Sequence, residues 1–173
     1  MPKPVDVTTP SDREVTVTRV FDAPRQLIWD CHTKPELVQR WLLGPPGWSM
    51  PICKVDLRVG GRYRYVWKND ESGAQFGSYG EHQAIDAPSR LVTTEMMDGL
   101  DGGPLLDEPP LDPAQAARNI LTLAEAGGRT TLTINMTFPS KAIRDQALQS
   151  GMSDGMAMGY DRLETLMAGQ GVG

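Results

Sequence analysis

Two histidines and two cysteines are the side chains of this chain that zinc would favour: Cys31, His32, Cys53 and His82. Structural zinc sites use four ligands at short paired spacings, and only the adjacent Cys31 and His32 form a pair. Cys31 fits better as a small core residue of a helix. The chain also lacks the Walker and dinucleotide glycine patterns. The sequence therefore predicts no metal and no cofactor.

Carboxylates offer a second kind of chemistry, because Glu81 and Glu95 could meet across neighbouring strands as an acid/base pair. The alternative is that they face solvent as partners of Arg62 or Arg64. No G-x-S-x-G nucleophile turn occurs. No catalytic residue is assigned from the sequence.

Aromatic side chains alternate along one expected strand, over 61–68. Tyr63, Tyr65 and Trp67 share one face of it, and Arg62, Arg64 and Lys68 share the other. The aromatic face is either ordinary core or a pocket wall with hydroxyl and indole groups that orient a guest molecule.

Further candidates for the same pocket come from other segments. Trp41 and Trp48 flank a Gly-Pro loop, His82 would be a polar handle, and methionines suit an adaptable wall. The candidate ligand-binding residues are Trp41, Trp48, Tyr63, Tyr65, Trp67, His82, Met152, Met156 and Tyr160.

Alternating and helical patterns predict the elements that must position these residues. Strands are expected over 14–21, 52–58, 61–68, 75–86, 90–97, 118–125 and 129–138. Two short helices follow the first strand, and one long helix runs from a cap at Ser140 to about residue 168. This order predicts an α+β fold in which a curved seven-stranded antiparallel sheet grips the long helix.

Small residues recur every four positions on the long helix, at Ala147, Gly151, Gly155 and Gly159. Each interior glycine weakens a helix by about 1 kcal/mol relative to alanine. We expect such a row where the helix closely approaches the sheet or a guest molecule.

The composition bounds the class of protein. The 173 residues suit one domain over 14–168, with a flexible leader over 1–13 and a tail over 169–173. The net charge of −5 argues against nucleic-acid binding. No apolar run is long enough for a membrane span, and the N-terminal residues do not resemble a signal peptide, so a cytoplasmic location is expected.

The long acidic connection over 98–117 is a candidate lid.

Several short motifs, in order, resemble those of one known superfamily. They are Val20-Phe21-Asp22-Ala23-Pro24, Trp29, Thr33-Lys34-Pro35-Glu36, Arg40-Trp41, Gly44-Pro45, Val55-Asp56-Leu57-Arg58, Gly60-Gly61-Arg62-Tyr63, Pro88-Ser89-Arg90-Leu91-Val92, Thr130 to Thr133, and Gly151-Met152 with Gly155-Met156. Together they resemble the START-like (SRPBCC) superfamily, and more closely its AHSA-type branch, named after an activator of a heat-shock-protein ATPase.

This resemblance implies a helix-grip fold, and the superfamily includes lipid carriers, plant hormone binders and aromatic cyclases. The leading hypothesis is a soluble binder or carrier of a small apolar or amphipathic molecule, held between the sheet and the long helix. One alternative is a cyclase-like or hydrolase-like enzyme in which His82 or Glu81 moves protons. The other is a co-chaperone-like interaction module that uses residues 98–117. A protein partner or a homodimer stays open.

Overall fold

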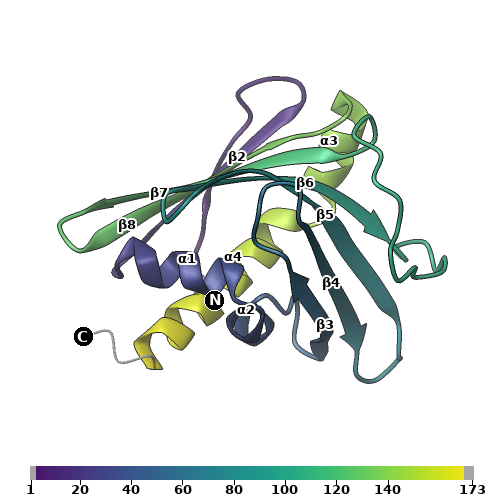
Figure 1. The fold of residues 1–173 in the computed structure, drawn as a ribbon, viewed down its shortest axis with the longest axis horizontal. Coiled ribbons are helices and arrows are strands. Elements are labelled where there is room, and N and C mark those ends of the chain that lie inside the picture. The colour runs from purple at the N-terminus through teal and green to yellow at the C-terminus, as the bar shows by residue number, and fades with distance from the viewer. Residues whose placement is uncertain (1–2, 170–173) are drawn as a thin grey trace.

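A computed structural model describes residues 3–169 and shows an α+β arrangement of one antiparallel sheet and four helices. The sheet has eight strands in the order β1-β2-β8-β7-β6-β5-β4-β3. In Figure 1 the sheet curves around α4, and α1 and α2 lie on the same side of the sheet as α4. The helix-grip prediction is confirmed. Within residues 3–169, no helix is both long and apolar enough to cross a membrane.

Most element bounds follow the predicted ones closely, but β3 begins four residues and ends three residues before the strand predicted over 52–58. The strands are β1 (Asp6–Thr8), β2 (Glu14–Phe21), β3 (Trp48–Val55), β4 (Arg62–Asn69), β5 (Gln75–Asp86), β6 (Arg90–Asp98), β7 (Ala117–Ala126) and β8 (Arg129–Thr137). The helices are α1 (Arg25–Thr33), α2 (Pro35–Trp41), α3 (Lys141–Gln149) and α4 (Met152–Gly169).

The leader is the first point at which the structure differs from the prediction. Residues Asp6–Thr8 form an eighth strand, which pairs antiparallel with Thr16–Thr18 of β2. The backbone N–H of Lys3 also donates to Asp161 on α4. The segment expected to be a flexible leader therefore contains one of the two edge strands of the sheet. Of the expected tail, Gly169 belongs to α4, and residues 170–173 lie outside the described residues.

The long C-terminal helix is two helices rather than one. Ser140 caps the first, as expected, by accepting a hydrogen bond from the backbone N–H of Ile143. Gly151 separates them, since its φ of +83° lies in the left-handed region that a right-handed helix cannot include. The break was missed because the apolar periodicity continues across it.

The loop over 98–117 does not cover the helix side of the sheet. Arg64 forms a two-pronged ion pair with Asp98 at 2.7 and 2.8 Å and also donates to the carbonyl of Leu106. Arg62 donates to the carbonyl of Pro109. Both arginines point away from the aromatic face of β4, so they hold the loop on the opposite side of the sheet. In this structure the loop is therefore held on that opposite side, and a lid function for it remains a prediction.

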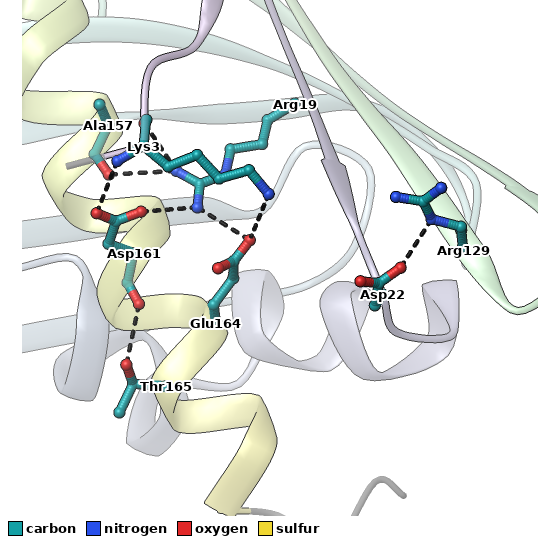
Figure 2. Close-up of polar contacts among 8 residues, drawn as sticks. All are labelled: Lys3, Arg19, Asp22, Arg129, Ala157, Asp161, Glu164 and Thr165. Atoms are coloured by element: carbon teal, nitrogen blue, oxygen red, sulfur yellow. Dashed lines mark hydrogen bonds and ion pairs between the residues drawn. The ribbon is translucent and has the colours of Figure 1, made fainter.

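One buried cation ties α4 to the sheet. Arg19 lies on the core side of β2, and its side chain is 2% exposed. Its guanidinium contacts the carboxylates of Asp161 at 2.7 Å and Glu164 at 2.9 Å (Figure 2). It also donates to the carbonyls of Ala157 and Lys3. Buried charges require such partners, so this cluster fixes where α4 crosses β2.

Neutralising the acids of this cluster should destabilise the protein. The double variant Asp161→Asn with Glu164→Gln leaves the Arg19 charge buried without a counterion. We expect the free energy of unfolding, measured by urea denaturation, to fall by about 3 kcal/mol.

The exposed ion pair between Asp22 and Arg129 provides a matched control, because it has the same 2.7 Å separation (Figure 2) but side chains that are 81% and 63% exposed. Asp22→Asn should change the free energy of unfolding by less than about 1 kcal/mol. Equal losses for the buried and the exposed pair would contradict the role given to Arg19.

Candidate functional site

A pocket of about 460 Å³ lies between the helix side of the sheet and α4. Strands β3 to β8 contribute its floor, and α1, α2, the loop over 42–44 and α4 contribute its remaining walls. Most of its lining is apolar or aromatic. The pocket therefore occupies the place between sheet and helix that the sequence predicted for a guest molecule.

Eight of the nine candidate ligand-binding residues line this pocket. They are Trp41, Tyr63, Tyr65, Trp67, His82, Met152, Met156 and Tyr160. Trp48 is not among the lining residues. It packs against Phe76 with ring centroids 5.3 Å apart, and Phe76 itself lines the pocket. Ligand contact remains a prediction for all nine.

The aromatic residues of β4 form one continuous wall, as the alternation predicted. The ring centroids of Tyr63 and Tyr65 are 5.1 Å apart, and those of Tyr65 and Trp67 are 6.0 Å apart. The indole of Trp67 donates to the carbonyl of Leu42 at 2.7 Å. The hydroxyl of Tyr63 donates to the carbonyl of Thr94 at 2.7 Å. These bonds hold the rings of Trp67 and Tyr63 in place. Burial raises the pKa of the Tyr63 and Tyr65 hydroxyls.

The wall opposite comes from α2 and α4. The ring of Trp41 stacks on Tyr160 with centroids 5.9 Å apart, and its indole N–H donates to the carbonyl of Cys31. A Cβ on Gly159 would lie 3.7 Å from the Trp41 ring, an ordinary van der Waals contact, so packing does not require glycine at this position. A Cβ on Gly155 would meet nothing within 4 Å, and Gly155 lines the pocket. The row therefore does not mark a close approach of the helix to the sheet, and contact of Gly155 with a guest molecule remains a prediction.

Polar side chains interrupt the apolar floor along one cross-strand row. His82, Thr93, Asn119 and Met136 are successive register partners from β5 to β8, and all four line the pocket. The neighbouring row, built by Leu91, Leu121 and Ile134, is apolar. A guest on this floor would meet polar groups in one band and hydrocarbon beside it.

Glu95 lies on the same face of β6 as Thr93. It accepts a hydrogen bond from the hydroxyl of Ser78 at 3.3 Å and another from the side chain of Asn119. Burial raises its pKa, and these two bonds oppose the rise. Glu81 is not a lining residue, and the backbone pairs it with Arg62. The candidate acid/base pair of Glu81 and Glu95 is therefore not formed in the pocket, and of the two proton-transfer candidates, His82 and Glu81, only His82 lines it.

Four buried nitrogen and oxygen atoms of the lining side chains have no hydrogen-bond partner within the described chain. They are Nε2 of His32, both ring nitrogens of His82, and Oδ1 of Asn119. From the sequence, His32 was considered only as a metal ligand and Glu95 only as an acid/base partner of Glu81, and Asn119 was missed. Asn119 lies two residues from Leu121 on β7, and Glu95 lies four residues from Leu91 on β6, so each shares a strand face with an apolar residue. This spacing was the signal in the sequence that Asn119 and Glu95 point inward.

Burial also determines the protonation of the other titratable groups near the pocket. It lowers the pKa of His32 to about 4 and, less strongly, that of His82, so both imidazoles are neutral at pH 7. Burial raises the pKa of the Cys31 and Cys53 thiols to about 11. Within residues 3–169, no three His, Cys, Asp or Glu side chains gather as a metal-binding group.

The lowered pKa of His32 predicts a pH dependence of stability. Because the unfolded chain binds more protons than the folded one between pH 6.5 and about 4, stability should fall as the pH is lowered through this range. Between pH 7 and pH 5, the titration of His32 should lower the free energy of unfolding by about 2 kcal/mol. Urea unfolding at pH 7 and pH 5 measures it.

The variant His32→Phe isolates this contribution from that of Glu95, whose raised pKa affects stability with the opposite sign. The wild type should lose about 2 kcal/mol more than His32→Phe between pH 7 and pH 5. If both proteins lose the same amount, His32 does not have the lowered pKa.

Solved structures match this fold closely. A protein from Rhodobacter sphaeroides superposes with a TM-score of 0.81 at 24% identity and covers 95% of this chain and 98% of its own. Protein Ms6760 from Mycobacterium smegmatis superposes with a TM-score of 0.76 at 28% identity, covering 94% and 96%. An HSP90 activator from Plasmodium falciparum shares the fold at a TM-score of 0.59 and 14% identity, covering 90% and 96%.

Sequence comparison gives a consistent assignment. No curated protein matches this sequence. Residues 22–168 match the family described as Activator of Hsp90 ATPase homolog 1-like protein. The match confirms the resemblance to the AHSA-type branch of the START-like superfamily, and it spans most of the domain that the sequence predicted. The chain therefore belongs to the Activator of Hsp90 ATPase homolog 1-like family.

Proposed function

We propose that this protein binds or carries a small amphipathic molecule in the pocket between the sheet and α4. The observation that carries the proposal is the combination of aromatic and aliphatic walls with a few convergent polar groups in one pocket. Ligand sites in proteins typically have this composition.

The size of the pocket supports the same function. Its volume of about 460 Å³ lies within the range of roughly 300–1,000 Å³ that is typical of small-molecule sites. A void of this size would also forfeit many dispersion contacts if it stayed empty, because protein interiors are otherwise closely packed. A guest with apolar surface would restore those contacts.

The walls suit guests of more than one shape. Tyr65 and Trp67 present rigid aromatic surfaces, whereas Met152 and Met156 of α4 are flexible and polarisable. Both cysteines are free thiols, which fits a carrier in a reducing compartment such as the cytoplasm.

A substitution that fills the pocket tests this function. Gly155→Leu places a side chain where a Cβ meets nothing within 4 Å, beside the pocket. Leucine also favours helix over glycine by about 1 kcal/mol, so the variant should fold at least as stably as the wild type. We expect the affinity for the fluorescent apolar probe N-phenyl-1-naphthylamine to fall about tenfold or more.

Asp154→Leu is the matched control, because it adds the same side chain one residue earlier, at an exposed position outside the pocket. Its affinity for the probe should stay within about twofold of the wild type. Saturable binding that Gly155→Leu leaves unchanged would place the probe elsewhere and overturn the proposal, as would the absence of any binding to the wild type.

A further inference from the structure

The unpartnered polar atoms of the pocket are mostly hydrogen-bond acceptors. A buried acceptor without a partner costs about 1–3 kcal/mol, so such atoms are rare in folded proteins unless another molecule satisfies them. Here they occur on two different walls, at His32 on α1 and at Asn119 on β7. Their chemical state indicates what kind of guest they require.

His32 presents a bare lone pair. Its Nδ1 lies 2.7 Å from the carbonyl oxygen of Ile28, and since a carbonyl can only accept, the ring proton must be on Nδ1. In a neutral imidazole the other nitrogen, Nε2, is then an acceptor. This atom is buried and unpartnered. The edge of the ring packs against Trp41, with centroids 4.9 Å apart, which keeps it in place.

Asn119 also presents an acceptor. Its side chain already hydrogen-bonds to the carboxylate of Glu95, an interaction for which the amide nitrogen is the donor. The amide oxygen, Oδ1, is left buried without a partner. Thr93 lies between Asn119 and His82 in the cross-strand row, so this acceptor belongs to the polar band of the floor.

His82 contributes one more acceptor and one donor to the same band. His82 is only 3% exposed, and neither of its ring nitrogens has a hydrogen-bond partner within the described residues. A neutral ring carries one N–H and one bare nitrogen. The pocket therefore holds three unpartnered acceptors and one unpartnered donor among these residues.

We propose that the ligand of this pocket is an aromatic or alicyclic molecule with at least two hydroxyl or N–H donors, one bound by Nε2 of His32 and another by the polar band of Asn119 and His82. This inference rests on the proposed binding function and deepens it by naming the class of guest. Phenols and hydroxylated ring systems belong to this class. Their ethers and hydrocarbons do not, because these would leave the acceptors buried and unpaired.

A matched set of naphthalene probes tests the inference. 2,6-Dihydroxynaphthalene has two donors, and 2,6-dimethoxynaphthalene has the same ring system with none. We measure both by competition against N-phenyl-1-naphthylamine in the full chain. The diol should bind about tenfold or more tightly than the diether, the difference expected from one or two neutral hydrogen bonds.

Two variants assign the preference to the named atoms. His32→Phe removes Nε2 but keeps a ring, and Asn119→Leu removes Oδ1 at similar volume. Each should reduce the preference for the diol about threefold to tenfold while the affinity for the diether stays the same or rises. Asn135→Leu is the control, because Asn135 lies on β8 outside the pocket lining and bonds to Thr16. It should leave the preference unchanged.

The outcomes separate the inference from the function on which it rests. Equal affinities for diol and diether in the wild type would overturn the inference while leaving a binding pocket, with water satisfying the acceptors. A preference for the diol that survives in both His32→Phe and Asn119→Leu would also overturn it. Failure of both probes and of N-phenyl-1-naphthylamine to bind would overturn the proposed function as well.

Discussion

The buried guanidinium of Arg19 connects the two layers of this fold. It reaches from β2 to the carboxylates of Asp161 and Glu164, in the second half of α4. Leu163, Leu166 and Met167 are buried around the same half of the helix. The first half carries Met152, Gly155 and Met156, which line the pocket instead. A rigid helix that is held to a curved sheet along one half leaves space under the other, and this constraint accounts for the position of the pocket.

The floor of that space has a chemical pattern that packing alone does not explain. Burying Asn119, His82 and Glu95 on the inner face of a sheet opposes folding unless their polar atoms find partners. Ser78 and the side chain of Asn119 satisfy part of the requirement, through the Glu95 carboxylate. The remaining acceptors belong to residues that line the pocket. A structural core would gain stability from leucine or valine at these positions, so the polar band favours a role in recognition.

Alternation and periodicity in the sequence predicted most of this architecture. The parity of Tyr63, Tyr65 and Trp67 placed the aromatic wall, because a strand turns every second side chain to the same face. Arg19 shares the parity of Val15, Val17 and Phe21, so a charge on the core side of β2 was visible in the sequence. Its carboxylate partners were not, since they are more than 140 residues away in the chain and only the folded topology brings them together.

Other features depended on information that local patterns do not contain. The three-residue strand β1 is too short for alternation to identify, and it exists because β2 offers an unpaired edge. A register shift between His82 and Ala84 hides the parity of β5, so the face of His82 could not be read from spacing. His32 was missed as a polar pocket group because its lone pair follows from a bond to Ile28 within its own helix.

The central claim is that a guest occupies the space under the first half of α4, and nuclear magnetic resonance of the ¹⁵N-labelled protein tests it directly. The four tryptophan indole N–H groups report on different places: Trp41 and Trp67 line the pocket, whereas Trp29 is buried outside it. Saturation with 2,6-dihydroxynaphthalene should shift the indole signals of Trp41 and Trp67 strongly and that of Trp29 little. Shifts confined to surface residues, with the Trp41 and Trp67 signals unmoved at saturation, would contradict it.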